Sequence, residues 1–172
     1  MPELLVWCPS IMAALKIKKL QQSTESEWCA RVMSQSEPWV TLERNFEESL
    51  QIISDSSKEV YLCSVQGEPA GFVILNMNGA FVGYIQTICV APDFRGHGIG
   101  SQLLEFAEDR IFTISPNVFL CVSSFNPRAR KLYERAGYET IGELKDYLVT
   151  GHSEILMRKS LGPLKDYKRS RD

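Results

Sequence analysis

Residues 88–104 read ICVAPDFRGHGIGSQLL: the end of an apolar strand, a short turn, a glycine-rich loop and the start of a helix. Gly96, Gly98 and Gly100 alternate with residues that carry side chains, so the main chain can approach a ligand closely there. The expected helix begins near Ile99, and its first-turn N–H groups and positive dipole end add to the donors of the loop. The stretch therefore predicts a site that binds a diphosphate group.

Two common phosphate-binding motifs do not fit this loop. A dinucleotide-binding fingerprint needs a further glycine where Ser101 stands, and a triphosphate-binding loop needs a lysine directly after Gly100. The pattern that remains is Arg95-x-x-Gly98-x-Gly100 after a strand. A glycine-rich turn that serves only the fold is the alternative interpretation.

A second motif follows in the next strand-turn-helix unit. Residues 118–125, VFLCVSSF, have the composition of a strand. Asn126-Pro127 then places asparagine at a helix N-cap and proline at the first helical position. The helix carries apolar side chains at helical spacing and ends at a glycine; these residues are Ala129, Leu132, Tyr133, Ala136 and Gly137.

The two motifs, in this order, resemble the GNAT superfamily of acyl-CoA N-acyltransferases. The resemblance implies that the loop binds the diphosphate of coenzyme A, that Asn126 bonds the coenzyme and that Tyr133 lies near its sulfur. It also implies a main-chain donor near the end of the strand that precedes the loop, with Val90 bonding the pantetheine arm. The implied coenzyme-binding residues are Ile88, Val90, Arg95, Gly96, Gly98, Gly100, Ser101, Asn126 and Tyr133. Acetyl-CoA is the implied co-substrate, and no metal is expected.

The resemblance also implies the chemistry. An uncharged amine attacks the thioester directly, a main-chain N–H around residues 88–90 binds the developing oxyanion, and the leaving thiolate needs a proton. Tyr133 is the expected general acid, since a tyrosine with a reference pKa of about 10 keeps its proton at neutral pH. A purely packing role, or positioning of the sulfur alone, are the alternatives for this residue.

The general base and the acceptor pocket are less defined. Some relatives that acetylate peptides place a glutamate on the strand where this chain has Cys121. His152 and Glu154 resemble a pair in the ribosomal-protein-alanine acetyltransferase subgroup and are candidates for the base. The expected lining residues of the acceptor site are Trp39, Glu43, Glu47, Tyr147 and His152. A dipole-stabilising role at a helix start is the alternative for the two glutamates.

Composition limits the function classes. The chain has 172 residues, 44% of them hydrophobic, and a net charge of −2, which predicts one enzyme-sized domain and no nucleic-acid surface. Five cysteines without paired spacing predict neither a disulfide framework nor a metal site, and favour a cytoplasmic location. The apolar segment 4–15 is interrupted by Pro9 and is too short to span a membrane. We expect an extension (1–14), the catalytic domain (15–160) and a basic tail (161–172).

The periodicity predicts an α/β chain with a mixed sheet. The expected order is strand 15–20, a helix with a capping box at Thr24 and Glu27, a helix capped by Thr41, and a hairpin around Gly67-Glu68. Strand 81–90, the glycine loop and its helix, strand 118–123 and the helix after Asn126 follow. Strands 138–143 and 153–158 close the order. The resemblance implies that the fourth and fifth strands splay apart where the acyl group enters.

Two functions remain open at this level. The first is an acetyl-CoA-dependent N-acetyltransferase that acts on a peptide or protein N-terminus or on a small-molecule amine. The second is a coenzyme-binding module without turnover that serves as a sensor or partner domain, which the missing carboxylate at Cys121 favours. A homodimer is one of the assemblies that either function allows.

Overall fold

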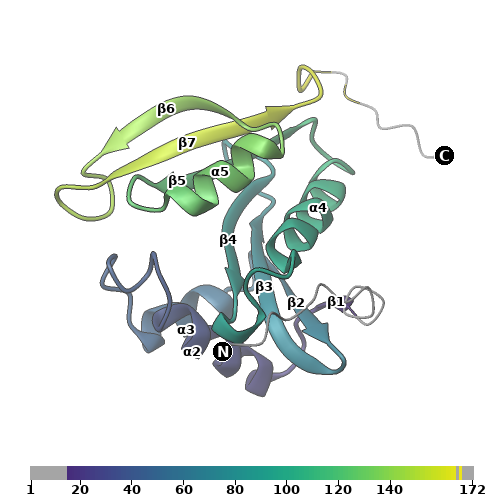
Figure 1. Cartoon of the computed structure of the whole chain (residues 1–172). Coiled ribbons are helices and arrows are strands. Elements are labelled where there is room, and N and C mark those ends of the chain that lie inside the picture. Colours follow the sequence, from purple (N-terminus) through teal and green to yellow (C-terminus); the bar gives the residue numbers. More distant parts are fainter. Residues whose placement is uncertain (1–14, 166, 168–172) are drawn as a thin grey trace, which may run out of the picture.

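Seven strands form one mixed sheet in the spatial order β1-β2-β3-β4-β5-β7-β6, in a computed structural model that describes residues 15–165 and 167 (Figure 1). The strands are β1 (Leu15–Lys19), β2 (Glu59–Val65), β3 (Glu68–Asn76), β4 (Tyr84–Val90), β5 (Asn117–Ser123), β6 (Glu139–Lys145) and β7 (Ser153–Ser160). The helices are α2 (Ser23–Ser34), α3 (Phe46–Ile53), α4 (Ile99–Ile111) and α5 (Pro127–Arg135), with a 3-10 turn, η1 (Pro92–Phe94). The predicted order of elements is confirmed.

The sheet divides between β4 and β5, the one parallel pair among its neighbouring strands. These strands pair only at Tyr84 with Phe119 and at Ile85 with Leu120. Beyond Ile85 they separate, and Figure 1 shows β5, β7 and β6 turned away from the first four strands. The splay that the resemblance implied is therefore present.

Apolar side chains cover both faces of the sheet. On β3, Phe72 and Ile74 pack with α2 and α3 on one face, while Val73 and Leu75 pack with α4 and α5 on the other. All four side chains are fully buried. Burial on both faces places β3 in the core, between the helices of the two layers.

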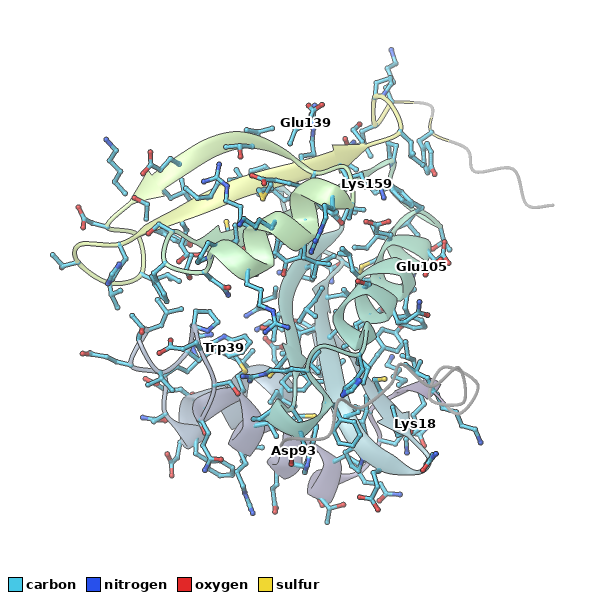
Figure 2. The ribbon with its side chains drawn as sticks, in the orientation of Figure 1. Lys18, Trp39, Asp93, Glu105, Glu139 and Lys159 are labelled. Carbon is cyan, nitrogen blue, oxygen red and sulfur yellow. The ribbon has the colours of Figure 1, made fainter. Side chains whose placement is uncertain are left out.

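An ion pair connects the two halves of the molecule. Lys159 Nζ on β7 lies 2.6 Å from Glu108 Oε2 on α4, and Figure 2 shows Lys159 on the side of β7 that faces this helix. Because both side chains are mostly buried, the pair is stronger than an exposed one and helps to set the angle between β7 and α4.

The first two helices do not begin where the sequence predicted. The capping box of α2 is formed by Gln22 and Glu25, not by Thr24 and Glu27. In both pairs, a residue whose side chain can accept a hydrogen bond stands three positions before a glutamate. The reciprocal bonds around Gln22 start the helix earlier, so Thr24 lies inside the first turn.

The helix expected from Thr41 begins at Phe46 instead. Asn45 Oδ1 accepts a hydrogen bond from the N–H of Glu48 at 2.9 Å, and Glu48 Oε2 accepts one from the N–H of Asn45 at 3.0 Å. Thr41 bonds the Glu37 carboxylate and remains in a turn. Asparagine with a reciprocal glutamate is the stronger cap, so it determines where the helix starts.

Strand β4 is shorter than predicted at its start. Gly83, with φ of 87°, breaks the extended conformation, and the strand begins at Tyr84 rather than residue 81. The expected extension 1–14 and half of the basic tail (166 and 168–172) lie outside the described residues. Within the described part of the chain, no helix has the length and apolar character needed to cross a bilayer.

Candidate functional site

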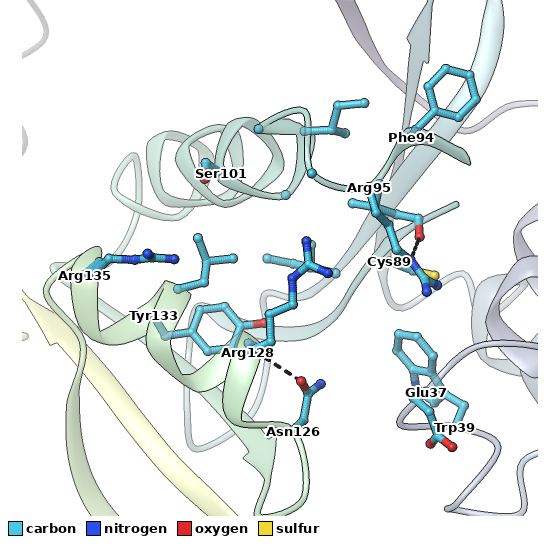
Figure 3. A pocket seen from close by; sticks show the side chains of 18 residues that line it. Glu37, Trp39, Cys89, Phe94, Arg95, Ser101, Asn126, Arg128, Tyr133 and Arg135 are labelled. Atoms are coloured by element: carbon cyan, nitrogen blue, oxygen red, sulfur yellow. Dashed lines mark hydrogen bonds between the residues drawn. The ribbon is translucent and has the colours of Figure 1, made fainter. Parts of the chain in front are cut away.

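A cavity of about 470 Å³ lies between the glycine loop and α5, at the point where β4 and β5 separate. Figure 3 shows Tyr133 and Asn126 on one side of it and Arg95 and Ser101 across from them. All nine residues predicted to bind a coenzyme line this single cavity: Ile88, Val90, Arg95, Gly96, Gly98, Gly100, Ser101, Asn126 and Tyr133. The fold thus brings together two motifs that the sequence separates.

The glycine loop presents unpaired main-chain donors to this cavity. None of the described residues accepts a hydrogen bond from the N–H groups of residues 96–101. Gly96 and Gly98 have φ of 82° and 81°, and a Cβ atom added at either would meet no heavy atom within 4 Å. Conformation, not crowding, explains these glycines, and the space beside them is free for a ligand. Donors at a helix N-terminus next to free space suit an anion.

Arg95 holds the loop against the protein. Its Nε donates to the main-chain oxygen of Val90 at 2.9 Å, and its Nη2 donates to Ser36 Oγ at 3.0 Å. Ser36 is buried just after α2, so the guanidinium connects the loop, the end of β4 and the first helical layer. The side chain lines the cavity as predicted, but these bonds give it a structural task that the motif did not indicate.

Asn126 caps α5 and keeps donors free. Its Oδ1 accepts a hydrogen bond from the N–H of Ala129 at 3.2 Å, as the predicted N-cap requires. None of the described residues bonds its side-chain NH₂ group. Because Asn126 lines the cavity, that group is a potential donor to a ligand.

Tyr133 is buried on α5 with its side chain in the cavity wall. Its ring lies 5.9 Å from that of Tyr138, between centroids, and burial raises its pKa to about 12. Within the described part of the chain, no group hydrogen-bonds its hydroxyl. The hydroxyl therefore holds its proton at neutral pH and is available to a bound molecule.

A second cavity, of about 440 Å³, lies on the other side of Tyr133. It lies beside β4, β5 and the start of β7, and the residues that line both cavities are Glu37, Trp39, Ile88, Asn126, Ala129 and Tyr133. Trp39, labelled in Figure 2, belongs to the segment after α2. Two molecules bound in the two cavities would meet beside Tyr133.

The predicted acceptor residues divide into two groups. Trp39 and Tyr147 line the second cavity, whereas Glu43, Glu47 and His152 do not; Glu154, predicted as a candidate base, also lines it. The Glu43 prediction assumed a helix that starts later in the chain. The His152 ring instead packs against that of Phe125, with centroids 4.7 Å apart.

Several groups that line the second cavity were not predicted. They include Glu37, Arg44, Tyr84, Thr87 and Ser123. Cys121 also lines it, and burial raises the pKa of its thiol. The cavity is therefore rich in polar groups that are mostly uncharged, with carboxylates at Glu37 and Glu154.

Comparison with known proteins agrees with this arrangement. A family model described as the acetyltransferase (GNAT) family matches residues 20–138. An uncharacterised N-acetyltransferase of Methanocaldococcus jannaschii is 38% identical over 98 residues, 51% of this chain and 42% of that protein. A peptidyl-lysine N-acetyltransferase of Salmonella typhimurium is 30% identical over 108 residues, 61% of this chain and 62% of that protein. The match thus spans less than two thirds of either relative.

Solved structures show the same fold. The ribosomal-protein-S18-alanine N-acetyltransferase of Escherichia coli superposes with a TM-score of 0.71 at 18% identity, over 90% of this chain and 99% of that one. The spermidine N-acetyltransferase of Vibrio cholerae, in complex with CoA and spermine, gives 0.68 at 22% identity, over 86% and 96%. Since the family model covers more than half of the sequence and the fold agrees, this chain belongs to the GNAT acetyltransferase family.

Proposed function

We propose that this protein transfers the acetyl group of acetyl-CoA to a primary amine. The observation that carries the proposal is the row of unpaired N–H groups at residues 96–101, which borders a cavity that joins a second one beside Tyr133. The diphosphate binds at the loop, the thioester reaches the gap between β4 and β5, and the amine enters from the second cavity. Free space beside Gly96 and Gly98 supports this fit.

The main chain of β4 is proposed to stabilise the oxyanion. Beyond Ile85, β4 has no partner on its β5 side, so N–H groups on that edge are not used by the sheet. Donors around residues 88–90 lie next to the first cavity, between the glycine loop and α5, which we call the coenzyme cavity. They can bond the carbonyl oxygen as it becomes negative. The direct attack needs no covalent enzyme intermediate, because the two cavities bring both reactants together.

Tyr133 is proposed to protonate the leaving thiolate. Its pKa of about 12 keeps the hydroxyl protonated, and burial strengthens its hydrogen bond to an anionic sulfur. The bond forms as charge develops on sulfur, which is when it accelerates the reaction. Two other roles were predicted for this residue: packing and positioning of the sulfur. These roles and the acid role predict different effects on turnover when the hydroxyl is removed.

The class of amine is proposed from the relatives and tested directly. Related proteins are named for peptidyl-lysine, spermidine and the alanine of ribosomal protein S18. The protein is incubated with acetyl-CoA and one acceptor at a time: spermidine, a peptide with a free N-terminal alanine, or an N-blocked peptide with one lysine. Thiol release that depends on one of these amines supports the proposal, and mass spectrometry places the added acetyl group.

A coenzyme-binding module without turnover is the second candidate, favoured by Cys121 in place of a carboxylate. Saturable coenzyme binding with no amine-dependent thiol release would establish it. We further propose the cytoplasm as location, since the free thiols of Cys29, Cys63, Cys89 and Cys121 suit a reducing compartment. The domain limits 15–160 and a homodimer also remain proposals, for limited proteolysis and light scattering to test.

A further inference from the structure

Glu154 is a buried carboxylate in the wall of the second cavity. Its residue is 5% exposed, and it lies at the start of β7 directly opposite Ser123, the last residue of β5. Ser123 Oγ donates to Glu154 Oε1 at 2.6 Å. Both residues line the cavity that shares Tyr133 with the coenzyme cavity.

The carboxylate has no cationic partner. No Lys, Arg or His side chain among the described residues forms an ion pair with Glu154, and its second oxygen has no hydrogen-bond partner there. A buried carboxylate that is bonded only by one hydroxyl is unfavourable unless a positive charge reaches it. The cavity offers a path by which a cation can do so.

The other groups that face the cavity do not replace Glu154 as a proton acceptor. Burial raises the pKa values of Tyr84 on β4, Cys121 on β5 and Tyr133 on α5, so these groups keep their protons at neutral pH. The remaining titratable or charged residues of the lining are Glu37, Arg44 and Tyr147, and the residue opposite Glu154 on β6 is Leu144. Glu37 is exposed, and its two oxygens already accept bonds from Thr41.

We propose that Glu154 binds the ammonium group of the acceptor and accepts its proton before the amine attacks. The inference rests on the proposed acetyl transfer. It adds that the acceptor amine is protonated, and therefore cationic, in solution. Ser123 positions the carboxylate, since its hydroxyl fixes one oxygen of a residue that lines the cavity and leaves the other oxygen without a partner among the described residues.

The step balances in atoms and charge. One proton of the ammonium moves to the Glu154 carboxylate, and the neutral nitrogen forms a bond with the acetyl carbon. The C–S bond breaks, and the nitrogen loses a second proton as the thiolate gains one from Tyr133. The second proton of the nitrogen passes through solvent to the Tyr133 oxygen, which restores its hydroxyl, and release of the Glu154 proton to water completes the cycle. The products are the amide, free coenzyme thiol and one proton.

Replacement of the carboxylate tests this role. Glu154→Gln keeps the size and hydrogen-bonding capacity of the side chain but accepts no proton. At pH 7 we expect its kcat/KM for the amine to fall by about tenfold or more, with acetyl-CoA affinity unchanged. The loss should shrink as pH approaches the pKa of the amine, because more acceptor then arrives already neutral. Glu139→Gln, an exposed glutamate on β6 outside both cavities, is the matched control and should leave kcat/KM unchanged.

A second variant tests Ser123. The hydrogen bond from Ser123 lowers the pKa of Glu154, while burial raises it above 4.5. Activity falls where the carboxylate becomes protonated, so Ser123→Ala should move the acidic limb of the kcat/KM profile to higher pH. A loss for Glu154→Gln that is equal at every pH, or an unmoved acidic limb in Ser123→Ala, would contradict the proposal.

Measurements of amine binding distinguish a failure of this inference from a failure of the proposed function. If the unmodified protein binds coenzyme A but releases no thiol, acetyl transfer fails, and calorimetry of spermidine and the two peptides with the coenzyme-bound protein still tests the ammonium site. Weakening of that binding by Glu154→Gln, but not by Glu139→Gln, supports the site. Equal affinities in the two variants, or no amine binding by the unmodified protein, overturn it.

Discussion

Arg95 Nε lies 2.9 Å from the main-chain oxygen of Val90, so the side chain at the start of the glycine loop bonds the last residue of β4. The same guanidinium reaches Ser36 after α2. The loop that is proposed to bind a diphosphate and the strand end that is proposed to bind the thioester are therefore fixed as one unit.

Loss of this guanidinium should affect both stability and binding. Arg95→Ala removes two hydrogen bonds from a charged donor, and we expect the free energy of unfolding to fall by about 1 to 3 kcal/mol. Urea unfolding measures the change, and calorimetry should show weaker acetyl-CoA binding. Arg128→Ala is the control, because Arg128 lines the same cavity and is exposed like Arg95 but has no such bonds among the described residues. Equal stability in the two variants would contradict the bridging role.

Two glycines with similar backbone conformations allow the effect of a substitution on coenzyme binding to be distinguished from its effect on stability. Gly98 and Gly79 have φ of 81° and 90°, and an added Cβ would meet no heavy atom within 4 Å at either. Alanine at either position should lower the free energy of unfolding by about 1 kcal/mol through backbone strain. Only Gly98→Ala should also weaken acetyl-CoA binding, since only Gly98 lines the coenzyme cavity. Comparable coenzyme affinities in the two variants would count against the loop as the binding site.

Tyr133→Phe tests the general acid. We expect kcat to fall by about 100-fold while the affinity for acetyl-CoA stays nearly unchanged, because the hydroxyl is needed when charge develops on sulfur. An acid loses its function as pH rises through its pKa, which for Tyr133 is about 12. The kcat profile of the unmodified protein should therefore show no basic limb from this group below pH 11. Unchanged turnover in Tyr133→Phe would remove the assignment.

Gly83 ends the turn before β4 in a crowded position. Its φ is 87°, and an added Cβ would lie 2.8 Å from the oxygen of Asn117 and closer still to Ile111. Gly83→Ala should lower the free energy of unfolding by about 3 kcal/mol, since strain and overpacking add. Gly142→Ala on β6, with no heavy atom within 4 Å, should change it by less than about 0.5 kcal/mol. Thermal unfolding of both variants measures this difference. Similar melting temperatures would contradict it and show that the crowding around a Cβ at residue 83 is relieved elsewhere.

The residues that line the proposed coenzyme cavity could be grouped from the sequence because its parts are local. Alternating glycines before a helix and the Asn126-Pro127 cap are short patterns with direct conformational causes. Helix starts at Ser23 and Phe46 were missed, since several nearby residues can cap a helix and only one pair forms in each case.

The acceptor cavity depends on contacts between distant residues. Ser123 faces Glu154 because the β6–β7 hairpin sets the register of β7 against β5. The contact between Arg95 and Ser36 likewise joins two segments that no short motif connects. The sequence pattern could suggest Glu154 as a candidate, but its burial and its missing cation follow from the fold alone.

The central claim is that main-chain N–H groups of residues 96–101 bind the diphosphate of acetyl-CoA. Amide NMR shifts test it most directly, by titrating the labelled protein with coenzyme A and, separately, with pantetheine, which lacks the diphosphate. The proposed site predicts large shifts at Gly96, Gly98, Gly100 and Ser101 with coenzyme A and small ones with pantetheine. Coenzyme A binding that leaves these four amides unshifted would contradict the claim.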